Sequence, residues 1–243
     1  MTVRVVLGTQ WGDEGKGKAI DVFAKDYDYV ARYNGGNNAG HTIVNEFGTF
    51  KIHLVPSGVF APQITALIGG GVVMDPSVLV KEIASLQDAG INLEGRLFIS
   101  PRAHLIMPYH KILDGLYEAA KGTGATGTTK RGIGPTFADK VSYNGIRWSD
   151  FADLRIFESR LTVQIEMKNK IITALGGEAL NFAQVRDIYL GYYEEIKPFI
   201  RETYPMVLDG LRDGKNFLLE QANGSLLDTD WGTYPFVTGS TTL

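Results

Sequence analysis

The sequence contains no cysteine, and this absence restricts both the chemistry and the setting of the protein. Without cysteine there is no disulfide framework, no thiolate metal site and no thiol nucleophile, which suits a reducing compartment. No apolar run approaches the ~20 residues of a membrane span, and the apolar stretch at the N-terminus is too short for a signal peptide. We therefore expect a cytoplasmic protein that does not bind membranes.

A large excess of charge of either sign is also lacking. The chain has 24 basic and 27 acidic residues, which gives a formal net charge of −3. Binding to nucleic acid or to an anionic membrane through bulk electrostatics requires a strongly basic surface. We expect no nucleic-acid partner, and any anion that the protein binds must be bound locally.

The apolar residues that are present predict an α/β fold. A hydrophobic content of 44% in 243 residues is ample for a packed core. Short apolar runs alternate with helical patterns, which is typical of a mainly parallel sheet flanked by helices. The predicted core strands lie at residues 3–7, 27–33, 64–70, 96–100 and 215–224.

Two further patterns complete the predicted fold. Residues 41–55 alternate apolar and polar side chains around a turn near Asn45 to Gly48, which predicts a hairpin at an edge of the sheet. Residues 153–173 and 180–203 carry apolar side chains at helical spacing, in the second case Val185, Ile188, Tyr192, Ile196 and Phe199. We interpret residues 1–243 as a single domain with a helical insertion at about 150–210.

The glycine-rich segment "GDEGKGK" (12–18) directly follows the first predicted strand. It fits the pattern G-x-x-x-x-G-K, whose backbone N–H groups cradle phosphate at a helix N-terminus. The next residue is Ala19, so the hydroxyl that a standard P-loop offers to Mg²⁺ is missing. Carboxylates beside phosphate make sense if one of them binds a metal ion or takes a proton. A charged turn before a helix remains the alternative.

Three more polar loops follow predicted strands or helices. They are "NGGNNAGHT" (34–42), "GATGTTKRGIGP" (124–135) and "NGSLLDTDWGTYPFVTGSTT" (223–242). Each alone is compatible with an ordinary turn, in which asparagine and glycine tolerate left-handed backbone angles. Ligand sites of α/β sheets gather where strands end, and four such loops together favour a phosphate-binding enzyme.

The segments "LGTQWGDEGKGK", "NGGNNAGHT", "PSGV", "GTTKRGIGP" and "LLDTDWGTYPFVT" resemble the signature segments of the adenylosuccinate synthetase family, in the same order. The resemblance covers essentially the whole chain and implies a P-loop-NTPase-like fold. It also implies GTP-dependent ligation of IMP and L-aspartate to adenylosuccinate through 6-phosphoryl-IMP, with GTP as co-substrate and Mg²⁺ as cofactor. A homodimer is implied as well.

The resemblance assigns roles to individual residues. Asp13 is expected to remove the N1 proton of IMP, and His41 is expected to act as general acid on the transferring phosphoryl group. The expected protein ligands of Mg²⁺ are the Asp13 side chain and the Gly40 carbonyl. GTP phosphates are assigned to Gly12, Asp13, Glu14, Gly15, Lys16, Gly17, Lys18, Gly40, His41 and Thr42. IMP is assigned to Asp13, Lys16, Asn38, Ala39, Gly40, His41, Thr129, Asn223 and Thr238.

Several positions depart from the family pattern. Tyr143 stands where the family has an arginine that reaches the IMP phosphate of the neighbouring subunit, and a phenol cannot replace a bidentate guanidinium. Arg147 is a conceivable substitute. Asn223 stands where many bacterial members have glutamine and keeps the amide, whereas Gln221 and Trp231 have no explanation in the sequence. His53, His104 and His110 lack metal-ligand spacing and are expected to be structural.

The length of the chain relative to the family leaves three interpretations of its function open. The family continues past the equivalent of "TGSTTL" into a part that carries a guanine-reading Lys-x-Asp segment and an aspartate-binding arginine loop. The chain is therefore interpreted as a fragment or truncated copy of a synthetase, with weak or no activity expected for residues 1–243 alone. Alternatives are a purine-nucleotide-binding homologue without turnover and an unrelated P-loop NTPase.

Overall fold

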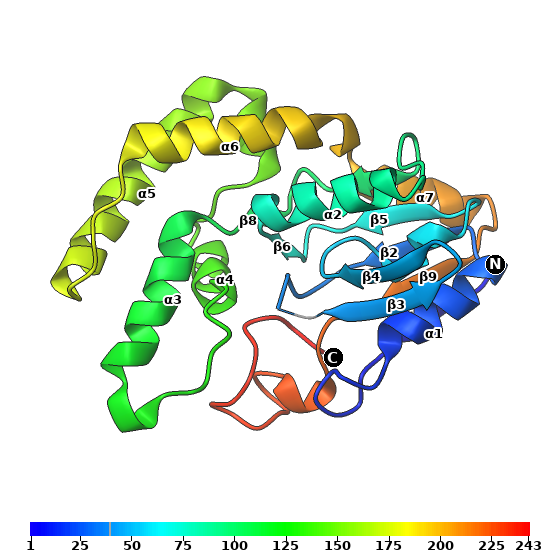
Figure 1. Cartoon of the computed structure of the whole chain (residues 1–243), viewed down its shortest axis with the longest axis horizontal. Helices are drawn as coiled ribbons and strands as arrows, with labels where there is room; N and C mark the ends of the chain where they lie inside the picture. Colours follow the sequence, from blue (N-terminus) through cyan, green and yellow to red (C-terminus); the bar gives the residue numbers. More distant parts are fainter. Residues whose placement is uncertain (39) are drawn as a thin grey trace.

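The computed structural model describes residues 1–38 and 40–243, and its centre is a five-stranded parallel sheet (Figure 1). The strands run in the order β1-β9-β2-β5-β7, and each neighbouring pair is parallel. Their bounds are Val3–Val6 (β1), Phe217–Glu220 (β9), Tyr29–Arg32 (β2), Thr65–Ile68 (β5) and Leu97–Ile99 (β7). The predicted mainly parallel α/β fold is confirmed.

Strand β9 lies between β1 and β2, although it is the last strand in the chain. Glu220 is in register with Val6 on one side and with Arg32 on the other. The carboxyl ends of β1, β2 and β9 therefore line up. The three polar loops that follow these strands leave the sheet side by side, which is the position where open α/β sheets bind ligands.

Three helices lie around this sheet (Figure 1). They are α1 (Lys16–Phe23), α2 (Pro76–Asp88) and α7 (Thr203–Arg212). α2 begins at Pro76, and the Asp75 side chain caps it by accepting a hydrogen bond from the Ser77 N–H (3.1 Å). α1 begins directly after Gly15, whose left-handed backbone (φ 86°) turns the glycine loop into the helix.

The predicted hairpin is present, but it does not extend the edge of the main sheet. Strands β3 (His41–Asn45) and β4 (Gly48–Ile52) form a separate two-stranded antiparallel sheet, and the turn lies where the sequence predicts it. Ile43 and Phe50 on its inner face are buried, and β3 packs on α1. The hairpin is therefore held by side-chain packing rather than by ladder hydrogen bonds to the five-stranded sheet.

The helical part of the chain differs in detail from the prediction. It comprises α3 (Pro108–Ala120), α4 (Ile133–Val141), α5 (Leu154–Ala174) and α6 (Phe182–Ile196). α6 ends before residue 203 because Pro198 lacks an N–H and interrupts the helical pattern; a 3-10 turn follows at Lys197–Phe199. Tyr189 takes the buried position, whereas Ile188 is 52% exposed. The interpretation of about 150–210 as an insertion in one domain stays a prediction.

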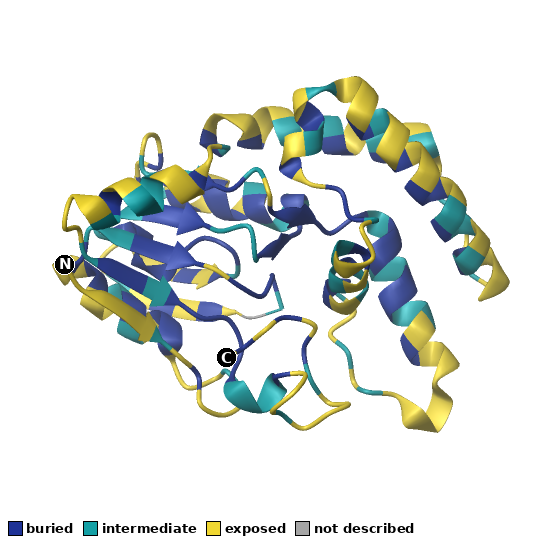
Figure 2. Cartoon of the chain, turned by 180° about the vertical axis from the view of Figure 1, so that it is seen from behind, coloured by how far each residue is buried: buried dark blue, intermediate teal, exposed yellow. Residues whose placement is uncertain are grey.

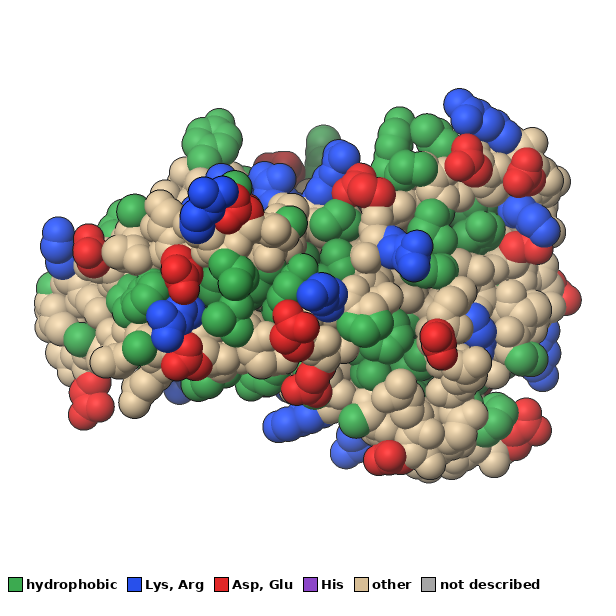
Figure 3. All heavy atoms as spheres, turned by 90° about the horizontal axis from the view of Figure 1, so that it is seen from above, with side chains coloured by type: hydrophobic (Ala, Val, Ile, Leu, Met, Phe, Trp, Pro, Cys, Tyr) green, Lys and Arg blue, Asp and Glu red, His purple; other side chains and the backbone are tan. Residues whose placement is uncertain are grey.

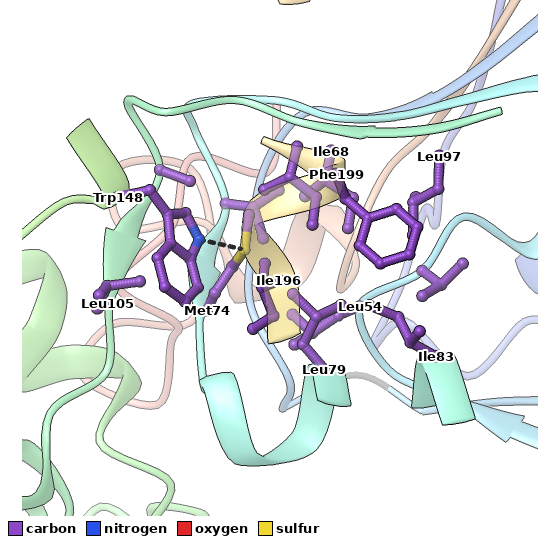
Figure 4. Packing of buried hydrophobic residues seen from close by; sticks show 14 of the residues in the cluster. Leu54, Ile68, Met74, Leu79, Ile83, Leu97, Leu105, Trp148, Ile196 and Phe199 are labelled. Atoms are coloured by element: carbon purple, nitrogen blue, oxygen red, sulfur yellow. Dashed lines mark hydrogen bonds between the residues drawn. The ribbon is translucent and has the colours of Figure 1, made fainter. Parts of the chain in front are cut away.

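The helical part shares its core with the sheet (Figure 4). Trp148 comes from the 3-10 turn Trp148–Ala152, and its indole N–H points at the sulfur of Met74 (3.4 Å). Met74 belongs to β6 (Val73–Met74), which pairs in parallel with β8 (His104–Leu105). Ile196 and Phe199 pack into the same cluster. One hydrophobic core therefore connects the helices to the strands that carry the polar loops.

β1 differs from the other strands of the sheet, which are largely buried (Figure 2). Val3 and Val5 of β1, and Leu7 just after it, are 49%, 43% and 48% exposed. On the face seen in Figure 3, basic and acidic side chains are interspersed. Within the described residues, no helix is both long and apolar enough to cross a membrane.

Candidate functional site

A cavity of about 990 Å³ opens where the polar loops meet. Its lining combines the glycine loop, the segment after β2, the segment from α3 to α4, and the loop after β9. Among the residues expected from the sequence, the lining includes Gly12, Asp13, Asn38, Gly40, Thr129, Asn223 and Thr238. Four loops that are far apart in the sequence thus converge on one cavity.

Two asparagines of this cavity have unused hydrogen-bonding capacity. The amide oxygens of Asn38 and Asn223 are buried and have no hydrogen-bond partner among the described residues. The Asn38 amide nitrogen lies 3.5 Å from the Thr238 hydroxyl, which joins the second loop to the fourth. Because buried polar atoms are nearly always paired in proteins, these atoms are suited to contact a polar ligand.

The loop after β9 packs so closely on the segment after β1 that Gly8 and Gly12 have no room for a side chain. A Cβ on Gly12 would lie 2.7 Å from the carbonyl carbon of Asn223, and a Cβ on Gly8 would lie 2.7 Å from its oxygen. Gln221, unexplained by the sequence, connects the same parts: its Oε1 accepts from the Gly8 N–H (2.7 Å), and its Nε2 donates to the Thr242 carbonyl. The side chain therefore holds the glycine loop to the segment at residues 238–242.

The remaining residues expected to hold GTP phosphates lie outside the cavity lining. They are Glu14, Gly15, Lys16, Gly17, Lys18, His41 and Thr42. Ala39, also expected to contact IMP, lies outside the described residues. Lys16 is only 3% exposed, and its ammonium group donates to the carbonyl of Gly12 in its own loop (2.8 Å). Burial lowers the pKa of Lys16, opposed by the nearby carboxylates of Glu14 and Glu220.

Glu14 closes the glycine loop on itself. Its carboxylate accepts a hydrogen bond from the Gln10 N–H (2.6 Å) and lies 3.9 Å from the Lys16 ammonium. Gly17 lies in the first turn of α1 and is packed against His41, since a Cβ on Gly17 would lie 2.5 Å from the Cβ of His41. The loop thus packs against the histidine expected to be the general acid.

His41 is buried between the glycine loop and the end of β9. Its Nδ1 lies 2.7 Å from Glu220 Oε1 and 3.1 Å from the Ser57 hydroxyl. Its other ring nitrogen, Nε2, is buried without a hydrogen-bond partner among the described residues. Sequence reasoning missed both Glu220 and Ser57, although Glu220 has a visible signal: a carboxylate at the end of an otherwise apolar strand that is buried in the sheet.

Two acidic residues of α3 support the third loop, and sequence reasoning missed them as well. Asp114 accepts hydrogen bonds from the Thr128 hydroxyl (2.7 Å) and from the Gly132 N–H (2.9 Å). Glu118 accepts from the N–H of Gly127 and from the hydroxyl of Thr126 (3.1 Å). Their spacing of four residues places both on one helix face, which is a signal that the sequence contains.

The donor set at the cavity limits what metal it can hold. Within residues 1–38 and 40–243, no group of three or more His, Asp or Glu side chains could bind a metal ion by itself. Asp13 and Gly40 line the same cavity and offer one carboxylate and one carbonyl. Such a sparse oxygen set fits Mg²⁺, which keeps several waters and takes phosphate oxygens as further ligands.

Of the residues that depart from the family pattern, Gln221 and Asn223 are buried, whereas Tyr143 and Trp231 lie on the surface. Tyr143 is 91% exposed and has a left-handed backbone (φ 66°) just after α4. Arg147 is exposed, and its Nε lies 3.4 Å from the ring of His104. Trp231 is 81% exposed, and nothing in the structure explains its indole.

A family model described as "Adenylosuccinate synthetase" matches residues 5–243 of this sequence. The chain belongs to the adenylosuccinate synthetase family. The resemblance drawn from the loop motifs is confirmed at the level of the family.

Curated relatives agree with this assignment. Adenylosuccinate synthetase of Clostridium botulinum (strain Loch Maree / Type A3) is 49% identical over 245 residues, covering 100% of this chain and 57% of that protein. The synthetase of Acetivibrio thermocellus is 49% identical over 241 residues, covering 99% of this chain and 57% of that protein. The chain therefore spans about 57% of the length of these adenylosuccinate synthetases.

Solved structures show the same relation. A fully ligated adenylosuccinate synthetase from Plasmodium falciparum is 33% identical with a TM-score of 0.89, covering 99% of this chain and 56% of that one. A cyanophage S-2L succinoaminodeoxyadenylate synthetase, bound to dGMP and to dATP as an energy donor, is 21% identical with a TM-score of 0.63. It covers 98% of this chain and 55% of that one, and it shows the shared fold alone.

Proposed function

We propose that this protein serves the GTP-dependent ligation of IMP and L-aspartate to adenylosuccinate through 6-phosphoryl-IMP, in the cytoplasm. The observation that carries the proposal is the convergence of Asp13, Asn38, Thr129 and Asn223 on one cavity of about 990 Å³. Membership of the adenylosuccinate synthetase family supports the choice of substrates.

Asp13 acts as the base in the proposed reaction. Its carboxylate lines the cavity and takes the N1 proton of IMP, which makes O6 of the purine a nucleophile. A bond forms between O6 and the γ-phosphorus of GTP while the bond from that phosphorus to the GDP oxygen breaks. The amino group of aspartate then attacks C6 and displaces phosphate. His41 donates a hydrogen bond to the transferring phosphoryl group, so base and acid polarise the same reacting bond.

The GTP phosphates are proposed to bind at the glycine loop and the start of α1. Gly12, Glu14, Gly15, Gly17, Lys18 and Thr42 belong to this proposed site together with Lys16. Lys16 donates to the Gly12 carbonyl in the structure, and we propose that phosphate oxygen replaces this carbonyl as its partner. Asp13 and the Gly40 carbonyl are the groups that would hold Mg²⁺, which when bound neutralises charge that develops on the phosphates.

The assembly is proposed to be a homodimer, as in the family. Tyr143 is 91% exposed and free to meet a second subunit, but its phenol offers a neutral hydroxyl in place of a guanidinium.

Calorimetric titration of the purified chain with IMP, with and without GTP and Mg²⁺, tests the proposal. We expect IMP to bind, and we expect Asp13→Ala to weaken binding roughly 10- to 100-fold, as for loss of a hydrogen bond to a charged group. Asp26→Ala is the matched control, because Asp26 is exposed and does not line the cavity. Absence of IMP binding by a demonstrably folded chain would contradict the proposal.

Turnover separates the remaining alternatives. IMP binding without phosphate release would favour a nucleotide-binding homologue, and ATP hydrolysis independent of IMP would favour an unrelated NTPase. In a protein that turns over GTP, IMP and aspartate, Asp13→Ala should lower kcat by about 10²–10⁴-fold, as expected for a positioned acid–base group.

A further inference from the structure

Glu220 is a fully buried carboxylate with several donors around it. It lies at the end of β9 and is 0% exposed. Its Oε2 accepts a hydrogen bond from the Ser57 N–H (2.8 Å), and its Oε1 accepts from the Ser57 hydroxyl (2.7 Å). The same Oε1 lies 2.7 Å from Nδ1 of His41. Ser57 and His41 thus meet both oxygens of one carboxylate.

The surroundings keep Glu220 ionised. Burial acts to raise its pKa, but the hydrogen bond from His41, the charge of Arg32 and the Ser57 hydroxyl together lower it. Arg32 lies opposite Glu220 in the β2–β9 pairing and is itself 0% exposed. A buried carboxylate that has lost its proton can only accept hydrogen bonds.

This geometry decides which nitrogen of His41 carries a proton. The Ser57 hydroxyl hydrogen already points at Glu220, so Nδ1 faces an acceptor-only carboxylate and must be the donor. The ring is also held in place from the other side, because Gly17 leaves no room for it to move toward α1. Nε2 is the nitrogen that remains without a partner among the described residues.

We propose that Glu220, together with Ser57, is a positioning residue that keeps Nδ1 of His41 protonated and leaves Nε2 as the nitrogen that faces the transferring phosphoryl group, to which Nε2 donates when the ring carries its second proton. The identity of that group rests on the proposed function. The proton assignment rests only on the contacts of Glu220, in the way that a carboxylate behind a ligand histidine sets its tautomer.

Glu220→Gln should reverse the tautomer. The Ser57 N–H is a backbone donor that cannot rotate away, so the glutamine oxygen must face it. The glutamine NH₂ then takes the place of Oε1 and donates toward Nδ1 of His41, which becomes the acceptor. The proton of the ring moves to Nε2, and the ring presents a donor where the wild-type neutral ring presents a lone pair.

Nitrogen-15 NMR of the imidazole rings measures this directly. The chain has 4 histidines, so each signal can be assigned with single His→Gln variants. We expect Nδ1 of His41 to be protonated in the wild type and Nε2 alone to be protonated in Glu220→Gln. His110 is an internal reference of the opposite kind: its Nδ1 accepts from the Met107 N–H (2.9 Å), and its Nε2 lies 2.8 Å from Asp139. Its signals should be the same in both proteins.

Ser57→Ala is the matched variant that keeps the carboxylate. It removes only the hydroxyl contact, so Nδ1 of His41 should stay protonated. An unprotonated Nδ1 in the wild type, or a protonated Nδ1 in Glu220→Gln, would overturn the proposal. The wild-type spectrum alone is decisive if Glu220→Gln does not fold.

Addition of IMP, GTP and Mg²⁺ separates this proposal from the proposed function. We expect the Nε2 signal of His41 to shift while Nδ1 stays protonated. An unchanged Nε2 with the expected tautomer would contradict the role of His41 in phosphoryl transfer and leave the proton assignment intact.

Discussion

Gly17 occupies a position where any side chain would collide with His41. A Cβ there would lie 2.5 Å from the His41 Cβ and 2.7 Å from its Cγ, and both groups are buried. We expect Gly17→Ala to lower the free energy of unfolding by about 1–3 kcal/mol, the usual cost of overpacking, and to weaken the proposed binding of IMP and GTP. Urea denaturation and calorimetry measure the two effects.

Gly115→Ala is the control for that experiment. Gly115 lies inside α3, where an added Cβ meets no atom within 4 Å. Alanine is the better helix former by about 0.5–1 kcal/mol, so this variant should be slightly more stable than the wild type. Equal losses in the two variants would contradict the steric argument.

His104 makes stability depend on pH. Burial, with Arg147 and Lys140 nearby, lowers its pKa from 6.5 to about 4. Between these values the unfolded chain binds a proton that the folded chain does not, so the free energy of unfolding falls as pH drops from 6.5 to about 4. In His104→Gln this contribution is absent, and denaturation curves across the window should show a shallower loss. Parallel losses in both proteins would rule out His104 as the cause.

At the scale of residues, the sequence predicts those site residues that lie in a recognisable local motif. Asp13, Asn38 and Gly40 stand in glycine-rich loops after apolar runs, and they line one cavity. Glu220 and Ser57 escape prediction because they meet across 163 positions, and no local pattern connects them. Gln221 gains its explanation only from the fold, which brings Gly8 and Thr242 to its two amide atoms.

At the scale of elements, a buried polar cluster ties three helices together. Asp139 of α4 contacts His110 of α3 (2.8 Å) and Lys168 of α5 (2.6 Å). Asp139→Asn leaves the Lys168 ammonium buried without a carboxylate, so we expect a loss of about 3–5 kcal/mol in the free energy of unfolding. Denaturant unfolding measures this loss.

The exposed pair Arg186–Asp187 provides the comparison. Its side chains are 33% and 64% exposed, and exposed pairs contribute less than about 1 kcal/mol. Asp187→Asn should therefore have little effect, and an effect as large as that of Asp139→Asn would argue against burial as the cause.

Elements are predictable where periodicity is strong and uninterrupted. The five core strands and α5 follow their apolar patterns closely. The prediction of a loop at 124–135 is wrong for its last residues, because α4 already begins at Ile133. Gly132, whose backbone is left-handed (φ 78°), precedes the first residue of that helix. The hairpin is found by its turn, but its separation from the main sheet depends on packing against α1, which the sequence does not display.

At the scale of the whole molecule, β1 is an open edge with apolar side chains on it. Val3, Val5 and Leu7 are each more than 40% exposed, although strands of parallel sheets are normally covered on both faces. We expect the 243-residue chain to associate as its concentration rises and Val5→Lys to reduce this association in sedimentation velocity. Val163→Lys is the control, since Val163 is 57% exposed on α5 and away from the edge. Equal effects would show that the edge is not the contact.

The position of β9 between β1 and β2 also determines how late the sheet can be completed during synthesis of the chain. Val6 and Glu220 are paired in the sheet, and at roughly 5–20 residues per second their emergence from a ribosome is separated by roughly 10–40 s. Throughout that interval β1 has no neighbour on the side that β9 will fill, and the glycine loop behind it has no support from Asn223 or Gln221. The loop that is translated among the first residues is therefore among the last to acquire its shape, and the nascent chain must remain soluble with the position between β1 and β2 unoccupied.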